Sequence, residues 1–207
     1  MPIKDYSDLN DMQMDVLREI GNVGSGNAAT ALSTMLDKAV NITVPKIKIL
    51  TFGEVATALG GPENIVVGLL LQLSDDVGGI MMFLLEKDFA SSTISTLTGM
   101  EMEDFANLDE MGVSVMSEIG NIMAASYVNA ISTMTGLTIN ISVPEIAVDM
   151  VGALLSVPAI YFANVSDKII FIENAFNCDG ESLSSHILMI PDVESLQKIL
   201  TMLGLDL

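Results

Sequence analysis

The chain contains two copies of one sequence pattern, and this duplication constrains its fold more than any other feature. Residues 9–45 align without a gap on residues 108–144, at an offset of 99 positions, with identical residues at fifteen positions. The later parts of the two copies correspond more loosely, so the duplicated unit is about as long as the offset, and two such units account for nearly all of the 207-residue chain. We therefore expect a fold with approximate twofold symmetry, in which each element of one half recurs in the other.

Each copy is predicted to begin with a long helix, because apolar residues recur at helical spacing behind an N-cap signal. We expect Asp8 with Asp11, and Asn107 with Glu110, to cap these two helices. Apolar strand segments and a shorter closing helix follow. The expected strands cover 42–50, 65–73 and 79–85 in the first copy and 139–150, 169–176 and 186–190 in the second, and the closing helices cover 88–97 and 193–203.

No linker rich in Gly, Ser or Pro separates the two copies, so they are expected to share one core. The predicted fold is α/β (α+β), with two long motif helices packed on a β-sheet. Residues 1–207 then form a single domain made of repeats at about 8–103 and 104–207. In the apolar segment 150–166, Gly152 and Pro158 are expected to leave only strand-length pieces, too short to span a membrane.

The composition excludes several classes of function. Half of the residues are hydrophobic and 17% are charged, which is enough apolar material for a substantial core. There are 27 acidic against 8 basic residues and no basic cluster, so nucleic acids and anionic membranes are not expected partners. A single cysteine and a single histidine, Cys178 and His186, offer no metal-ligand spacing. These features together indicate a cytoplasmic protein that binds no metal.

The residues that suggest chemistry lie on the two long predicted helices. Asp15, Glu19 and Asn22 stand at i, i+4 and i+7, within an arc of about 60° on a helix. The second copy repeats this stripe with Ser114, Glu118 and Asn121. From spacing alone, a structural use is equally open, in which the Glu and Asn side chains hold neighbouring backbone groups in a symmetric core.

The glycine-rich turn after the first stripe is not read as a phosphate loop, since no strand precedes it and no lysine follows. Gly24 and Gly26 lie inside a helical pattern, where glycine weakens a helix by roughly 1 kcal/mol relative to alanine. The second copy has alanines at the corresponding turn. On this ground we expect the second helix to be stiffer and its candidate site to be the more effective of the two, whereas the glycines of the first helix would allow a partner to dock more closely and Asp15 would offer it a stronger contact than Ser114.

The full pattern, Asp/Ser-x3-Glu-x2-Asn-x22-Pro, resembles the signature of the CheC, CheX and FliY phosphatases of bacterial chemotaxis. Both copies complete it, the first with Pro45 and the second with Pro144. Two intact copies in a chain of this length resemble CheC in particular, because CheX is shorter and FliY carries a further rotor-associated domain. The prolines also mark strand entry, where a missing N–H is tolerated.

The resemblance implies a phosphatase that hydrolyses the aspartyl phosphate of a CheY-type receiver domain. Asn22 and Asn121 would orient the attacking water, and Glu19 and Glu118 would pair with a lysine of the receiver. Asp15 and Ser114, with the two prolines, would be supporting positions. The receiver would carry the Mg²⁺ ion, and the chain itself would need no cofactor.

The resemblance also leaves alternatives open. CheC proteins bind the receptor deamidase CheD, so the main role could be that of a regulatory adaptor with secondary phosphatase activity. A flagellar-switch component is a third reading, which the missing rotor-associated domain weakens. In either of the first two roles the protein is expected to be a monomer.

Overall fold

The computed structural model describes residues 5–102, 104–162, 166–178 and 181–205. A short 3₁₀ helix, Tyr6–Asp8, precedes the first repeat. The first repeat comprises α1 (Asp11–Leu36), β1 (Val40–Ile42), β2 (Lys46–Thr51), α2 (Phe52–Ala58), β3 (Ile65–Asp75), β4 (Gly79–Leu85) and α3 (Lys87–Thr98). The second comprises α4 (Glu110–Thr135), β5 (Ile139–Ile141), β6 (Glu145–Met150), α5 (Val151–Tyr161), β7 (Lys168–Cys178), β8 (Glu181–Pro191) and α6 (Val193–Met202).

The same order of elements therefore occurs twice, and the described strands form one antiparallel sheet to which both repeats contribute. The strand order is β1-β7-β8-β4-β3-β5, with β2 also paired to β7 and β6 also paired to β3. The short strands are exchanged between the repeats, because β1 and β2 pair only with β7, and β5 and β6 only with β3. The predicted α/β fold with two long helices on a sheet is confirmed.

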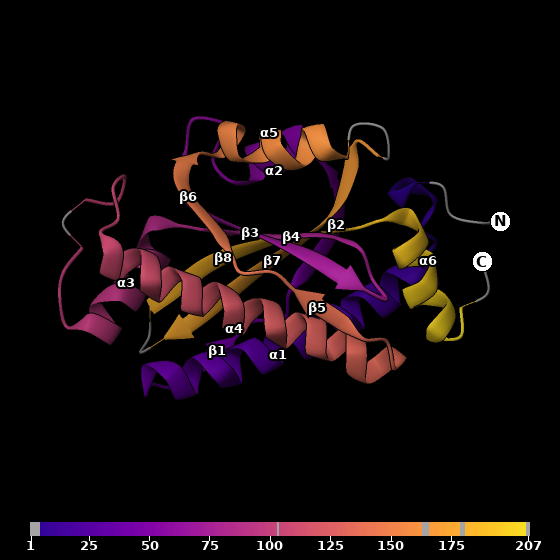
Figure 1. The fold of residues 1–207 in the computed structure, drawn as a ribbon, viewed down its shortest axis with the longest axis horizontal. Coiled ribbons are helices and arrows are strands. Elements are labelled where there is room, and N and C mark those ends of the chain that lie inside the picture. The colour runs from indigo at the N-terminus through magenta and orange to yellow at the C-terminus, as the bar shows by residue number, and fades with distance from the viewer. Residues whose placement is uncertain (1–4, 103, 163–165, 179–180, 206–207) are drawn as a thin grey trace.

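Helices cover both faces of the sheet (Figure 1). Successive strand residues point to opposite faces, so the neighbours of two adjacent residues identify the layers. A Cβ on Gly120 of α4 would lie 3.2 Å from Leu69, whereas a Cβ on Gly68 would lie 3.0 Å from Leu154 of α5. Thus α4 packs on one face of β3 and α5 on the other. Helices α1 and α4 lie side by side and run in opposite directions (Figure 1).

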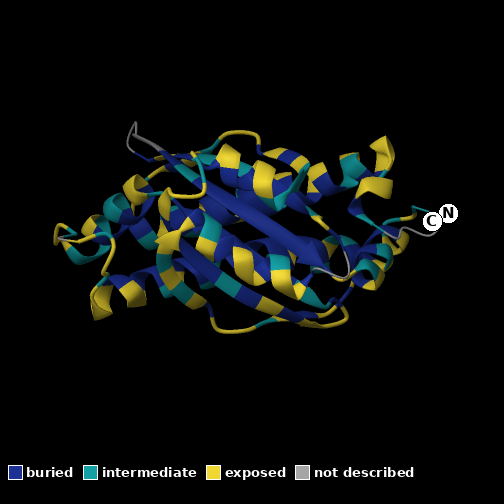
Figure 2. Cartoon of the chain, turned by 90° about the horizontal axis from the view of Figure 1, so that it is seen from above, coloured by how far each residue is buried: buried dark blue, intermediate teal, exposed yellow. Residues whose placement is uncertain are grey.

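The buried apolar residues of both repeats form one core between these layers. Figure 2 shows the central strands as buried, while exposed residues follow the outer sides of the helices. Burying apolar surface against the sheet is the main stabilising contribution to helices of this kind. In the described part of the chain, no helix is long and apolar enough to cross a membrane.

Both helix caps lie two residues after the predicted ones. Asn10 caps α1, where its side chain accepts from the N–H of Gln13 and the Gln13 side chain accepts from the N–H of Asn10. Asp8 is instead the last residue of the preceding 3₁₀ helix, and its side chain accepts from the N–H of Asp5. Asp109 caps α4 by accepting from the N–H of Gly112, at 2.7 Å, so Asn107 is not the cap. Several polar residues precede each helix, and sequence alone did not choose among them.

Two predictions about the strands and short helices were wrong. The segments 42–50 and 139–150 are not continuous strands, because each is interrupted before its proline and resumes at Lys46 or Glu145. The segment 150–166 contains the helix α5 rather than strand pieces, and Pro158 lies within it. The described parts of the other predicted strands and both closing helices are confirmed, except that β8 begins at Glu181, well before the predicted start at His186.

We predict that a fragment of residues 1–103 does not fold as a stable monomer. In that fragment β1 and β2 have no pairing partner, because β7 is absent, and β3 loses the pairing on its outer edge. Unpaired strand edges favour association. Size-exclusion chromatography with circular dichroism should show aggregates or dimers. A soluble monomeric fragment with a cooperative melting transition would show that the repeats are independent domains, and would overturn the single-domain prediction.

Candidate active site

The first polar stripe lies on the outer side of α1, where Asp15, Glu19 and Asn22 are all exposed. On α4 the equivalent Ser114 and Glu118 are exposed. Asn121 completes the second stripe and is partly exposed. The structure therefore brings the predicted residues together in two groups of three, each along one side of a long helix.

The Glu and Asn side chains of both stripes have no structural partner. Among the residues that the structure describes, none of Glu19, Asn22, Glu118 or Asn121 forms a side-chain hydrogen bond or an ion pair. A residue used to hold backbone groups in the core would show such bonds. The structural use that the sequence left open is therefore not found, and all four side chains are available to an external group.

The motif prolines pack against the inner sides of the two long helices. Pro45 and Pro144 are both buried. A Cβ on Gly21 would lie only 2.4 Å from Cδ1 of Ile47 and 4.0 Å from Cγ of Pro45. A Cβ on Gly120 would lie 3.5 Å from Cγ of Pro144. A glycine thus stands just before each motif Asn and faces inward, where it lets the proline and the sheet approach the helix closely.

The two sites differ at the supporting position. Asp15 forms an ion pair with Arg18 at 2.5 Å, and both side chains are more than half exposed. The equivalent residues on α4 are Ser114 and Ser117, which carry no charge. An exposed pair of this kind contributes little stability, but it places a cation beside Asp15 in the first stripe, where the second stripe has none. The sequence reasoning missed Arg18, although an Asp with an Arg three residues later on a helix is a recognisable signal.

A buried ring of three hydrogen bonds joins α1, α4 and β7. Ser25 Oγ donates to Asn174 Oδ1 at 2.9 Å, and Asn174 Nδ2 donates to the Tyr127 hydroxyl at 2.9 Å. The ring closes through Tyr127 and Ser25, whose oxygens lie 2.5 Å apart. Burial raises the pKa of Tyr127 to about 12, although the bonds from Ser25 and Asn174 act in the opposite direction. The tyrosine is therefore neutral at physiological pH.

This ring changes the interpretation of the glycines that follow Asn22. Gly24 is buried against the ring of Tyr127, with a Cβ position only 2.6 Å from Cδ1, whereas Gly26 has nothing within 4 Å of its Cβ position. Gly24 is thus a packing contact, and Ser25 is tied to the core. The expectation that both glycines loosen α1 holds at most for Gly26. The prediction that the second site is the more effective one therefore stays a prediction, and of the two glycines on which it rested only Gly26 still supports it.

We predict opposite effects of alanine at these two glycines. Gly24→Ala should lower the free energy of unfolding by about 1–3 kcal/mol, because the added methyl group overlaps the Tyr127 ring. Gly26→Ala should raise it by about 0.5–1 kcal/mol, because the helix gains alanine in open space. Guanidinium unfolding curves measure both. A stabilising Gly24→Ala would show that the Tyr127 contact is not a tight one.

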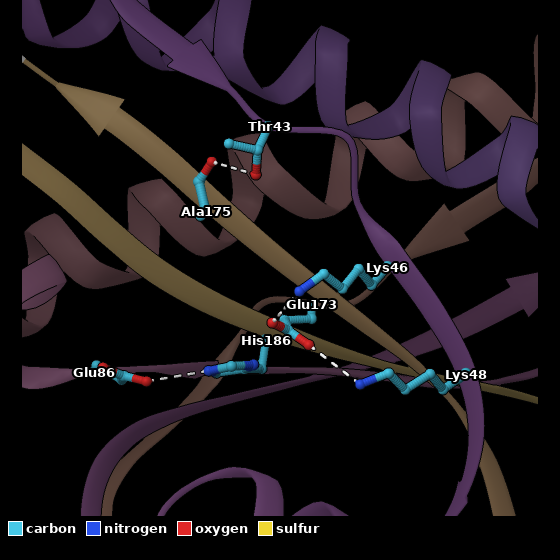
Figure 3. A network of polar contacts seen from close by, with 7 residues as sticks. All are labelled: Thr43, Lys46, Lys48, Glu86, Glu173, Ala175 and His186. Carbon is cyan, nitrogen blue, oxygen red and sulfur yellow. Dashed lines mark hydrogen bonds and ion pairs between the residues drawn. The ribbon is translucent and has the colours of Figure 1, made fainter.

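A second polar cluster lies on the other face of the sheet (Figure 3). Glu173 accepts from Lys46 and Lys48, whose charges hold its pKa below the usual range, although partial burial acts against this. The buried His186 lies 3.2 Å from Glu86 and stacks on Phe171. Since Asn174 belongs to the buried ring between α1 and α4, its neighbour Glu173 faces away from the motif helices.

Neither the polar stripes nor the cluster around Glu173 suggests a metal centre. Among the described residues, no three His, Cys, Asp or Glu side chains stand close enough together to hold a metal ion. The arrangement on α1 and α4 instead offers a carboxylate and an amide side by side, twice, at an open surface. Such a pair can position a water molecule and a cation that belong to a bound partner.

Comparison with known proteins agrees with this picture of a duplicated α/β protein carrying two surface Glu–Asn motifs. The CheC-like family model matches residues 12–49 and 111–148, which contain both motifs. The CheY-P phosphatase CheC of Bacillus subtilis is 32% identical over 207 residues, 98% of this chain and 99% of that protein. The chain therefore belongs to the CheC-like family.

Other relatives share part of the sequence or only the fold. The flagellar motor switch phosphatase FliY of Bacillus subtilis is 28% identical over 70% of this chain but only 38% of its own length. The crystal structure of Thermotoga maritima FliY has a TM-score of 0.74, with 23% identity over 95% of this chain and 98% of that chain. A CheX–CheY–BeF₃–Mg²⁺ complex from Borrelia burgdorferi matches with a TM-score of 0.52 and 18% identity, covering 81% and 94%. These two structures support the fold alone.

Proposed function

We propose that this protein is a cytoplasmic phosphatase that hydrolyses the aspartyl phosphate of a CheY-type receiver domain. The observation that carries the proposal is the pair of exposed Glu–Asn motifs, whose four side chains have no partner in the described chain. The 32% identity to a CheY-P phosphatase over nearly the whole chain supports the same substrate. Fold similarity to a CheX bound to CheY is consistent with it.

The phosphatase itself has to supply few chemical groups for this reaction. An aspartyl phosphate is an activated acyl phosphate, and the receiver supplies the Mg²⁺ ion and a lysine at its own site. A water oxygen attacks phosphorus in line, the bond from phosphorus to the aspartyl oxygen breaks, and the aspartate leaves as a carboxylate. The Asn22 or Asn121 amide accepts a hydrogen bond from this water and holds it in line, as a glutamine does in small GTPases.

The glutamates fix the receiver over the amide. Glu19 and Glu118 each lie one helical turn before the motif Asn, on the same side of the helix. A charge-assisted hydrogen bond to the receiver's lysine would therefore place the phosphoryl group above the Asn. The excess of 27 acidic over 8 basic residues attracts a partner that presents lysine, and the attraction raises the rate of encounter.

Replacing both motif asparagines should abolish the phosphatase activity without unfolding the protein. We expect Asn22→Ala with Asn121→Ala to slow the accelerated loss of phosphate by about two orders of magnitude or more, because the attacking water is no longer aligned. The melting temperature should stay within about 2 °C, since both side chains lack partners. The measurement is phosphate release from a phosphorylated CheY-type receiver.

The matched control replaces two exposed asparagines of the same helices that lie beyond the ends of the stripes, five and eight residues after the motif Asn, Asn27→Ala with Asn129→Ala. This variant should keep the activity of the unmodified protein. Retention of full activity by the motif variant would rule out the water-positioning role. Adding Glu19→Ala and Glu118→Ala should also raise the KM for the receiver, because the lysine contact is lost.

A second candidate function is that of an adaptor for a CheD-type deamidase. The observation that favours it is an exposed apolar end of α5, where Val157, Ile160 and Tyr161 are 53%, 77% and 68% exposed. Helix α5 lies on the other side of the sheet from α1 and α4 (Figure 1). Exposed apolar groups of this size are typical of protein-binding surfaces.

The adaptor role predicts that deamidase binding and phosphatase activity separate by mutation. Ile160→Ser with Tyr161→Ser should weaken binding of a CheD-type deamidase by about tenfold or more, because two exposed apolar anchors are removed. The Asn22→Ala, Asn121→Ala variant should bind it normally. Isothermal titration calorimetry measures both affinities. Equal binding by the α5 variant and the unmodified protein would place the deamidase elsewhere or exclude it.

A further inference from the structure

Exposed apolar side chains recur at equivalent positions beside both candidate sites. Met12 and Met111 are 66% and 52% exposed, and Val44 and Val143 are 79% and 77% exposed. The members of each pair are 99 positions apart, the offset of the repeat. Among the exposed large hydrophobic residues of the described chain, no other two are separated by this offset. Both sites therefore present the same apolar groups to solvent.

These side chains lie at the two ends of each polar stripe. Met12 precedes Asp15 by three residues and so lies one turn earlier on the same side of α1. Val44 is joined to Pro45, which packs at the level of Gly21, next to Asn22. The distance along the helix from Met12 to Gly21 is about 14 Å at 1.5 Å per residue. The stripe thus runs from an exposed methionine to an exposed valine.

The second site repeats this arrangement in full. Met111 lies one turn before Ser114, and Val143 is joined to Pro144, which packs at the level of Gly120. Single exposed apolar side chains are common on protein surfaces, but here the same pair recurs beside each candidate site, where polar residues of the same shape would leave less apolar surface in water. The apolar groups are therefore better explained by a surface that covers them.

We propose that Met12 with Val44, and Met111 with Val143, form apolar brackets that seat the phosphorylated receiver over each Glu–Asn pair. This inference rests on the proposed phosphatase function and assigns affinity for the receiver to residues outside the signature motif. A bracket about 14 Å long fits within a typical protein interface of about 800 Å² per partner. Once covered, its apolar ends exclude bulk water from the polar centre, where the glutamate and amide act.

The receiver is the occupant that the surroundings favour. The brackets are continuous with the candidate catalytic stripe, so a partner that docks on Glu19 or Glu118 with an interface of ordinary size also covers them. The neighbouring charges are mostly acidic, with Asp11 and Glu110 next to the two methionines, which suits a partner that presents a lysine. A second copy of this acidic chain would meet like charge at the same place.

The experiment isolates one site at a time in the 207-residue protein. In a Glu118→Ala, Asn121→Ala background only the first site can act, and there we introduce Met12→Gln and Val44→Thr. These replacements keep the shape of each side chain but make its surface polar. The KM for a phosphorylated CheY-type receiver should rise about fivefold to tenfold, while kcat stays within about twofold.

The converse experiment uses a Glu19→Ala, Asn22→Ala background with Met111→Gln and Val143→Thr, and the same result is expected. The matched control in both backgrounds is Met150→Gln with Ile65→Thr. These two residues are paired across β6 and β3 near α5, and they are 46% and 43% exposed. The control should leave both KM and kcat unchanged.

A second measurement separates this inference from the proposed function. Binding of the receiver, activated with beryllofluoride and Mg²⁺, is titrated against each variant without turnover. Weaker binding by the bracket variants together with no phosphatase activity in the unmodified protein would support the docking surface and overturn the proposed function. An active protein whose bracket variants match the control in KM and in binding would overturn the inference alone. A fall in kcat at constant KM would overturn it as well, because the residues would then not act in docking.

Discussion

The close approach of the two motif helices to the sheet and to each other is the contact on which the rest of the structure depends. It occurs where the helices lack side chains, at Gly21 against Ile47, at Gly24 against Tyr127 and at Gly120 against Leu69. Gly21 and Gly120 directly precede the motif asparagines. Packing and function therefore share one helical turn, with the glycine facing inward and the amide outward. The position of each amide is set by this packing, since the side chain makes no bond of its own in the described chain.

The duplication gives the fold two equivalent surface sites, but the interior is not symmetric. The strand registers pair Lys46 with Glu173 and Glu145 with Leu70, so the first-repeat counterpart of Asn174 is Leu71. The counterparts of Ser25 and Tyr127 are alanines. The buried ring of hydrogen bonds therefore exists once, where symmetry would allow two. A ring in which each member donates and accepts is well satisfied, and it fixes the pairing of α1 with α4 more specifically than apolar contacts alone.

Much of the fold follows from the sequence because its strongest signals occur twice. The long helices, the strands β3 and β4 and the position of the polar stripes all follow from spacing. The helix α5 could not be predicted in this way, because its sequence is almost entirely apolar and contains Gly152 and Pro158. Yet its buried residues Val151, Leu154, Leu155 and Pro158 have helical spacing, and Thr51 with Glu54 forms a capping box before the equivalent α2. The exposed apolar end of α5 was therefore also missed, since exposure depends on which side of the helix meets the sheet.

The open surface of the candidate sites is consistent with the reaction proposed for them. An enzyme that activates its own nucleophile or acid needs a pocket that excludes water and shifts a pKa. Here the motif residues line neither of two cavities in the described chain, of about 830 and 520 Å³, which lie around α3, the loop that follows it and the start of α4. When the partner supplies the reactive bond, the metal ion and the lysine, the water-excluded space forms only on docking. The rigid presentation of a carboxylate and an amide, supported from behind by a glycine and a proline, is then what this chain has to provide.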